Sequence, residues 1–271
     1  MADAAALSFT SQGTGPAVLL LHGQPGSARV WALVQPLLAA AGMRAIAVDR
    51  PGYGRTGGRP VGFSRNARLA LDLLDELDLA EVIVVGHSWS GGVAMSMALQ
   101  RPHRVRGLVL QGSVGGASSI NLADRVLAVP ILGPLAVRAG LQAAALGLPR
   151  ERIRHWIAPE FDALPTQAVT AIAAAWGKTH TGRAVAHEQR SLIAELPVIE
   201  AQLSRVRPPT LVLAGRQDLR VSPQSQRDLA DRLPDAEFVE VDGGHLLAVE
   251  APEQIVAAVL RVREAAPSAP S

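Results

Sequence analysis

Short apolar segments alternate along the chain with longer segments in which apolar residues recur every three or four positions. Continuous runs of Val, Leu and Ile are typical of parallel strands buried on both faces, and the longer segments then provide the connecting helices. A turn at 12–15 predicts a short N-terminal hairpin before the first buried strand. The predicted strands are 17–21, 45–48, 82–85, 108–110, 210–213 and 238–241, and the predicted helices are 27–41, 64–78, 90–101, 223–233 and 252–264.

The alternation stops between Gly112 and Arg207, where the sequence is rich in Ala, helical in its spacing and interrupted by prolines. Open parallel sheets bind ligands beyond the carboxyl ends of their strands, and this stretch begins just after such an end. We therefore predict a helical lid at 113–207 and an α/β core made of 1–112 and 208–265. Residues 266–271 are predicted to be a disordered tail. Helices packed elsewhere, with no role in binding, are the alternative.

The charge pattern argues against nucleic-acid binding. The formal net charge is +2, and Lys178 is the single lysine among 26 basic residues, so the high isoelectric point arises from arginine. These arginines are interspersed with acids, and aromatic residues make up only 3% of the chain, so neither a basic face nor a stacking platform is indicated. The expected partner is a small-molecule substrate.

The chain contains no cysteine, which excludes disulfides, thiol catalysis and thiolate metal sites. Its start lacks a basic segment ahead of an apolar run, and no later apolar run is long enough to cross a bilayer. We expect a cytoplasmic protein without a membrane span. The oligomeric state is not predicted.

The strongest local signal for chemistry is the segment from Val82 to Gly92, in which a buried strand leads into a turn of small residues and then a helix. A serine on such a strand-to-helix elbow is lifted into the cleft at the sheet edge, and the close backbone approach requires small neighbours. Ser88 is therefore the predicted nucleophile. Ser90 is the alternative, but the strand run ends too early for an elbow centred there.

A serine hydroxyl needs a base to become nucleophilic, and the base needs a carboxylate that fixes its tautomer. His245 follows the last predicted strand, and Asp218 follows the preceding one, so both lie on the same sheet edge as Ser88. The chain order Ser, Asp, His is the one expected of this strand-elbow arrangement. We predict that His245 is the general base and that Asp218 orients it.

A tetrahedral oxyanion is usually stabilised by backbone amides that already point at the developing charge. The loop from His22 to Gly26 leaves the first buried strand, and Pro25 within it has no N–H. The amides of Gln24 and Trp89 are the predicted oxyanion donors. No pair of histidines in the lid has the helical spacing of a metal site, so we expect neither a metal nor a cofactor.

In combination, five motifs resemble those of lid-bearing serine hydrolases of the α/β-hydrolase fold. The resemblance implies an eight-stranded, mostly parallel sheet and ester hydrolysis through an acyl-enzyme, with Asp49 and Glu250 holding loops and caps. The motifs are His-Gly-x-Pro-Gly at 22–26, Asp-Arg-Pro-Gly-Tyr-Gly-Arg-Thr at 49–56, Gly-His-Ser-Trp at 86–89, Gly-x-x-Asp at 215–218 and Gly-His-x4-Glu-x-Pro at 244–252.

Departures from related groups narrow the expected reaction. Epoxide hydrolases and haloalkane dehalogenases of this fold have aspartate where this chain has Ser88, and epoxide hydrolases use lid tyrosines, whereas the single tyrosine, Tyr53, lies outside the lid. An Ala- and Leu-rich lid favours small to medium, apolar esters. A perhydrolase or haloperoxidase, lactonase, acyltransferase or lyase would use the same triad, and an aminopeptidase would need Glu188 or Glu195 for the substrate amine. A non-catalytic ligand receptor is the remaining alternative.

Overall fold

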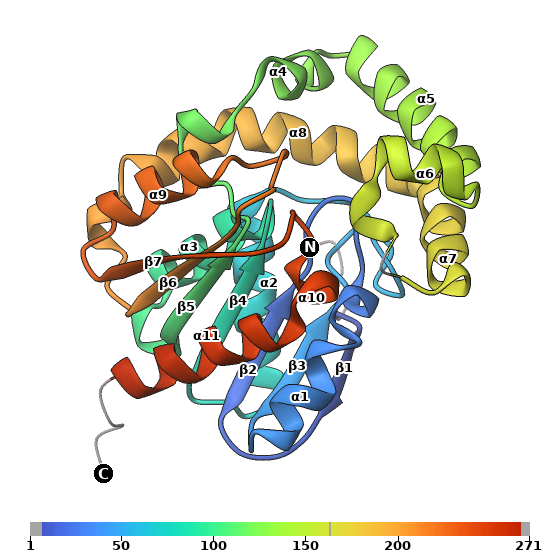
Figure 1. Cartoon of the computed structure of the whole chain (residues 1–271). Coiled ribbons are helices and arrows are strands. Elements are labelled where there is room, and N and C mark those ends of the chain that lie inside the picture. The colour runs from blue at the N-terminus through green and yellow to red at the C-terminus, as the bar shows by residue number, and fades with distance from the viewer. Residues whose placement is uncertain (1–6, 163, 267–271) are drawn as a thin grey trace.

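The computed structural model describes residues 7–162 and 164–266 (Figure 1). The predicted tail, apart from Ala266, lies outside the described residues. These residues form one seven-stranded sheet in the order β1-β3-β2-β4-β5-β6-β7, in which only β1 is antiparallel to its neighbour. The strands are β1 (Phe9–Gln12), β2 (Ala17–Leu21), β3 (Arg44–Val48), β4 (Val82–His87), β5 (Val105–Gln111), β6 (Thr210–Gly215) and β7 (Ala236–Val241).

Two expectations for the sheet are wrong. The resemblance implies eight strands, whereas the described residues form seven, with β1 at one edge of the sheet and β7 at the other. The predicted hairpin is absent from this part of the chain because β1 pairs with β3 rather than with β2. Both edges of β2 are occupied by its parallel partners β3 and β4, so no edge of β2 is left for β1.

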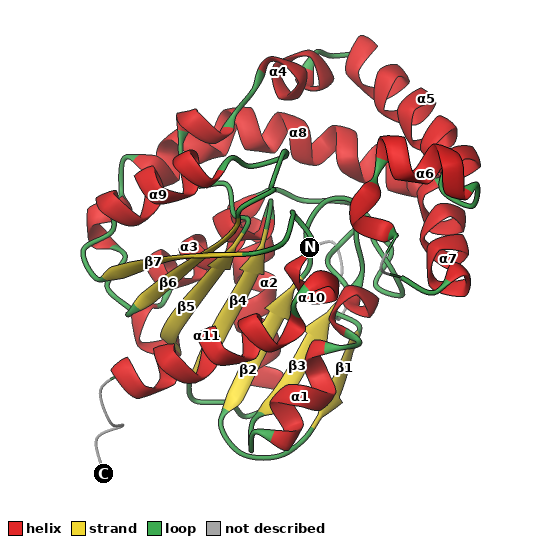
Figure 2. Cartoon of the chain, viewed as in Figure 1, coloured by secondary structure: helices red, strands yellow, loops and turns green. Residues whose placement is uncertain are grey.

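Helices cover both faces of the sheet (Figure 2). Successive strand residues point to opposite faces, so Leu19 and Leu21 join one apolar cluster with α2 and α3, while Val18 and Leu20 join another with α1 and α11. The helices of the core are α1 (Val34–Ala40), α2 (Phe63–Glu76), α3 (Ser90–Gln100), α9 (Pro223–Arg232), α10 (Leu247–Glu250) and α11 (Pro252–Ala265). Short 3-10 helices lie at Ala28–Trp31, Pro102–Arg104, Ala117–Ser119, Pro159–Phe161 and Leu203–Arg205.

The helix predicted at 27–41 is two helices in the structure, the 3-10 turn at Ala28–Trp31 and then α1. Pro36 explains the break, because its ring would collide with the carbonyl four residues earlier, at Ala32, in a continuous helix. The helices α2, α3, α9 and α11 begin and end within two residues of their predicted bounds, whereas the short helix α10 was not predicted.

Between β5 and β6 the chain forms a helical insertion at the carboxyl ends of the strands (Figure 1). Its last and longest helix contacts α2 and α3, and Leu192, Leu196 and Ile199 of that helix belong to the core cluster on that face. This helix is therefore anchored in the α/β core. The insertion helices are α4 (Leu122–Ala128), α5 (Leu132–Gly147), α6 (Glu151–Ile157), α7 (Thr166–Trp176) and α8 (Thr179–Glu200).

No single helix in the described ranges is both long enough and apolar enough to cross a bilayer. The pair α4 and α5 meets the length and composition criteria only when the two are taken together, and they are bent by 113° relative to each other.

Candidate active site

The backbone at Ser88 is in the left-handed region, with φ at 55°, between the end of β4 and the start of α3. This conformation is strained for a residue with a side chain and persists only where the surroundings enforce it. The Ser88 amide donates to the Gln111 carbonyl at 2.9 Å, and a Cβ added at Gly86 would lie 2.7 Å from the Ser90 carbonyl oxygen. The fold thus builds the sharp elbow that the small-residue segment predicted.

Three side chains from three loops meet at this elbow. The Ser88 hydroxyl lies 3.0 Å from Nε2 of His245, and Nδ1 of the same imidazole lies 2.8 Å from Oδ2 of Asp218. Because the Asp218 carboxylate can only accept, the imidazole proton belongs on Nδ1, and Nε2 is free to accept from Ser88. Ser88 is partly exposed, whereas Asp218 is buried.

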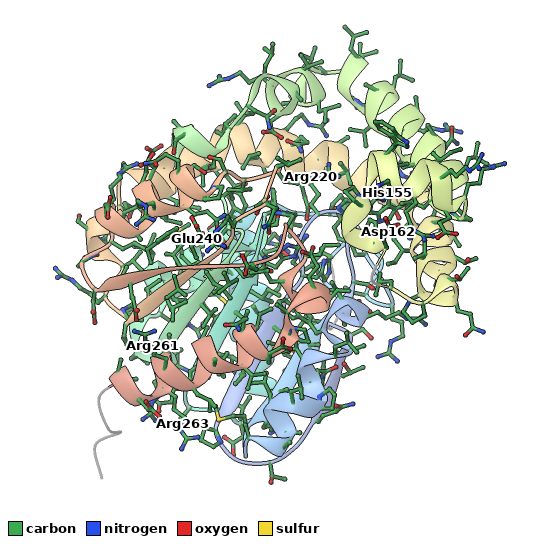
Figure 3. The ribbon with its side chains drawn as sticks, in the orientation of Figure 1. His155, Asp162, Arg220, Glu240, Arg261 and Arg263 are labelled. Atoms are coloured by element: carbon green, nitrogen blue, oxygen red, sulfur yellow. The ribbon has the colours of Figure 1, made fainter. Side chains whose placement is uncertain are left out.

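Asp218 is held by two backbone amides besides the imidazole. Its Oδ1 accepts from the amides of Arg220 at 2.8 Å and Val221 at 3.0 Å. Arg220 lies on the same loop and is labelled in Figure 3. The second oxygen, Oδ2, faces Nδ1 of His245.

The loop that carries His245 is held by Gln111 and His87, which were not predicted to belong to the site, and by Glu250, for which the resemblance implied a loop-holding role. The His245 carbonyl accepts from Nε2 of Gln111 at 2.9 Å and from Nε2 of His87 at 3.0 Å. Glu250 accepts from the amides on both sides of His245, those of Gly244 and Leu246. Gln111 follows no motif, so only its position at the end of a predicted strand could have indicated it.

The predicted oxyanion loop lies directly against the elbow. A Cβ added at Gly23 would be 2.9 Å from the Ser88 Cβ and 2.8 Å from the His87 ring, so this close approach requires glycine. Among the described residues, the amides of Gln24 and Trp89 donate to no protein acceptor. Both predicted donors are thus unpaired. Gln24 directly follows Gly23, and Trp89 directly follows Ser88, so both amides are next to the close approach of Gly23 and Ser88.

Ser90, the alternative nucleophile, is fully buried and donates its hydroxyl hydrogen to the His22 carbonyl at 2.6 Å. Its hydroxyl is therefore engaged with the loop at 22–26. Asp49 organises the adjoining segments, because it accepts from the amides of Ala28 at 2.7 Å and Arg55 at 2.9 Å.

Two buried histidines next to the site are held neutral. Burial lowers the pKa of His22 well below its usual value, and the nearby Arg50 lowers it further. Burial likewise lowers the pKa of His87, with His245 as the second cause. His22 donates from Nδ1 to the Gly23 carbonyl and accepts from the Arg50 amide at Nε2, so it braces the oxyanion loop in one defined tautomer.

Elsewhere in the described residues, the structure shows no group of three His, Cys, Asp or Glu side chains arranged to hold a metal. In the insertion, Nδ1 of His155 and Oδ2 of Asp162 lie 2.8 Å apart, and the imidazole is 71% exposed; both residues are labelled in Figure 3.

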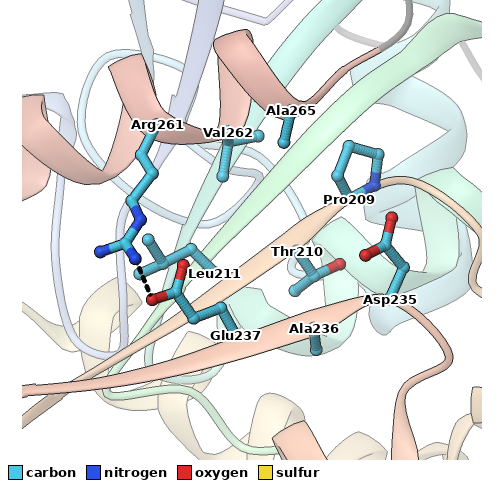
Figure 4. A pocket seen from close by; sticks show the side chains of 9 residues that line it. All are labelled: Pro209, Thr210, Leu211, Asp235, Ala236, Glu237, Arg261, Val262 and Ala265. Atoms are coloured by element: carbon cyan, nitrogen blue, oxygen red, sulfur yellow. Dashed lines mark ion pairs between the residues drawn. The ribbon is translucent and has the colours of Figure 1, made fainter.

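Two hollows on the surface lie away from the elbow. One of about 170 Å³ opens at the amino-terminal ends of β6 and β7, beside α11, and the ion pair between Arg261 and Glu237 lies at its side (Figure 4). Another of about 190 Å³ lies between α2 and α3, at Arg68 and Gln100. Ser88, Asp218 and His245 follow the carboxyl ends of their strands, whereas the hollow beside α11 lies at the amino-terminal ends of β6 and β7.

The chain belongs to the alpha/beta hydrolase fold family, whose model matches residues 16–252. It is 28% identical to haloalkane dehalogenase 2 of Mycobacterium bovis over 270 residues, which cover 94% of this chain and 90% of that protein. An epoxide hydrolase of Caballeronia sordidicola is 38% identical over 122 residues, 42% of this chain but only 37% of the relative. A thermophilic esterase of Thermogutta terrifontis superposes with a TM-score of 0.73 at 24% identity, over 96% of this chain and 94% of the other.

The neutral histidines predict how stability depends on pH. The unfolded chain binds protons at both imidazoles near pH 6.5, whereas the folded chain does so only at much lower pH. The free energy of unfolding should therefore decrease as pH falls from 6.5, by up to about 1.4 kcal/mol per pH unit for each histidine.

Urea unfolding between pH 8 and 5 measures this slope. His87→Gln should remove the contribution of one histidine, and the exposed His103→Gln is the matched control that should keep the original slope. An unchanged slope in His87→Gln would show that the buried imidazole is not the source.

Proposed function

We propose that this protein is a serine hydrolase that cleaves carboxylic esters of small to medium, mainly apolar substrates through an acyl-enzyme. The observation that carries the proposal is the continuous hydrogen-bond path from Ser88 through His245 to Asp218, with separations of 3.0 and 2.8 Å. Both are within the range over which a base removes a proton. No cofactor enters the proposed reaction.

In the proposed mechanism the Ser88 oxygen attacks the ester carbonyl carbon while its proton moves to Nε2 of His245. The carbonyl oxygen becomes an oxyanion that accepts from the amides of Gln24 and Trp89. His245 then gives the proton to the leaving alkoxide, and an alcohol departs. Water, deprotonated by His245, attacks the acyl carbon. The bond from that carbon to the Ser88 oxygen then breaks, His245 returns the proton to this oxygen, and the carboxylic acid leaves.

Two features favour ester hydrolysis over the reactions named for the haloalkane dehalogenase and the epoxide hydrolase. An alcohol nucleophile at position 88 forms an ester that water can hydrolyse at the acyl carbon. The only tyrosine, Tyr53, is buried and donates its hydroxyl hydrogen to Glu188 at 2.7 Å, so it is engaged and does not offer an acid to an epoxide oxygen.

The aminopeptidase alternative needs a free lid carboxylate for an amine. Glu188 is fully buried and paired with the Arg50 guanidinium, so its charge is already neutralised. Glu195 accepts from the Ser64 amide at 3.0 Å. A receptor without catalysis would not require the strained backbone at Ser88, which costs free energy of folding.

The helical insertion is proposed to serve as the lid. Leu246, next to the candidate base, packs against an apolar cluster of the insertion that contains Phe161 and Val169. An apolar wall beside His245 favours apolar acyl or alcohol groups. Lactones, peracids and acyl acceptors other than water would use the same triad, and a substrate panel separates them.

Ser88→Ala and His245→Ala should each lower kcat by about 10⁶-fold, and Asp218→Asn by about 10⁴-fold, because the three side chains act as a unit. The double variant Ser88→Ala with His245→Ala should be no slower than either single variant. Steady-state hydrolysis of p-nitrophenyl butyrate measures these values, and Asp242→Asn on the exposed part of the His245 loop is the control. Full activity in Asp218→Asn would overturn the assigned orienting carboxylate.

Rapid mixing with p-nitrophenyl butyrate should release a burst of nitrophenolate equal to the enzyme concentration, if acylation precedes a slower hydrolysis. EDTA should have no effect. Turnover of a chlorobutane or an epoxide of the same size, without ester turnover, would contradict the proposed function.

A further inference from the structure

Arg50 lies immediately after Asp49 at the end of the β3 segment and is almost completely buried. Its Nε donates to the His22 carbonyl at 2.9 Å, and its terminal nitrogen Nη2 donates to the Gly23 carbonyl at 3.1 Å. These two carbonyls immediately precede the amide of Gln24, the proposed oxyanion donor. The guanidinium therefore fixes the two peptide groups that set the direction of that amide.

In the described part of the chain, one carboxylate pairs with the Arg50 guanidinium, and it belongs to the helical insertion. Glu188 of α8 pairs with Nη1 of Arg50, and its second oxygen accepts from the Tyr53 hydroxyl at 2.7 Å. Burial raises the pKa of Glu188, whereas Arg50 and Tyr53 lower it. A buried guanidinium is costly unless such an anion holds it, so the position of Arg50 depends on Glu188.

The same turn of α8 also contacts both proposed oxyanion residues. The indole nitrogen of Trp89 donates to the Glu188 carbonyl at 3.1 Å, and the Arg50 guanidinium stacks over the Trp89 ring at 4.6 Å. The side-chain amide of Gln24 donates to the Val185 carbonyl at 2.9 Å and accepts from Gln189 at 3.3 Å. One helical turn thus touches the two residues whose amides face the oxyanion.

From these contacts we infer that Val185–Gln189 of α8 positions the oxyanion hole, with Glu188 acting through Arg50 as its main positioning residue. The inference rests on the proposed function, since it assigns a role within the proposed acyl transfer. It also makes the insertion part of the catalytic framework, beyond any role in substrate selection. A deletion of residues 115–204 would remove Glu188 and leave the buried Arg50 without its anion. Such a deletion would therefore disturb the oxyanion loop as well as any effect of the insertion on substrate preference.

Glu188→Gln tests the inference with little change in shape. The amide is neutral and leaves the Arg50 charge unbalanced, so the carbonyls of His22 and Gly23 lose a fixed donor and the Gln24 amide loses its direction. We expect kcat for p-nitrophenyl butyrate to fall about 10- to 100-fold, with KM changed less than about threefold. This decrease in kcat should not exceed the decrease that follows removal of one oxyanion donor. Affinity for an alkyl trifluoromethyl ketone, which forms a tetrahedral oxyanion on serine, should decrease by a similar factor.

Glu195→Gln is the matched control, because this glutamate lies two turns further along α8 and accepts from the Ser64 amide, away from the oxyanion loop. It should keep the original kcat and ketone affinity. Tyr53→Phe is the second variant, which removes one donor to Glu188 without creating a buried charge and should lower kcat about two- to fivefold. It decides the question if Glu188→Gln does not fold.

In a background where Arg50 is replaced by Met, Glu188→Gln should have no further effect on kcat, because the two side chains act along one path. Wild-type kcat and ketone affinity in both folded Glu188→Gln and Tyr53→Phe would overturn the inference, as would equal losses in Glu195→Gln. A wild-type enzyme that binds the ketone but turns over no ester overturns the proposed function alone, because ketone affinity still reports on positioning. A wild-type enzyme that does neither overturns both.

Discussion

The left-handed backbone at Ser88 is the constraint on which the rest of the site depends. It turns the chain from β4 into α3 within two residues, and the turn is possible only because glycines lie at the positions where neighbouring backbone approaches most closely. Gly23 brings the oxyanion loop onto the Ser88 Cβ, and Gly112 leaves room for the pair of His245 and Asp218. The strained elbow therefore sets the places of the other loops.

Parallel strands make this arrangement possible because their carboxyl ends meet at one edge of the sheet. Residues 88, 218 and 245 follow β4, β6 and β7, and each reaches the same edge although 157 residues separate the first from the last. The insertion closes over that edge and contributes Glu188, so a buried ion pair joins it to β3 and the oxyanion loop. The proposed lid and the proposed oxyanion hole would then both depend on one helix, α8.

The sequence was most informative where the signal is local or follows from strand order. The buried runs predicted the central strands, and the loops after them predicted the group formed by Ser88, Asp218 and His245, whose catalytic roles remain predictions. The pairing of Arg50 with Glu188 was not predictable, because the two are 138 residues apart and a charged residue inside a helical pattern is usually solvated. The partner of β1 was also predicted wrongly. The turn at 12–15 indicates a hairpin with the next strand, whereas β1 pairs with β3, a contact between distant parts of the chain that the local sequence does not reveal.

The central claim is that Ser88 is the nucleophile activated by His245, and chemical labelling tests it most directly. A fluorophosphonate should phosphonylate one serine in the wild-type protein, and peptide mapping should place the adduct on Ser88, while Ser90→Gly should still be labelled. His245→Ala should react far more slowly, because the hydroxyl then lacks its base. An adduct on Ser90, or labelling of Ser88→Ala at the wild-type rate, would contradict the account.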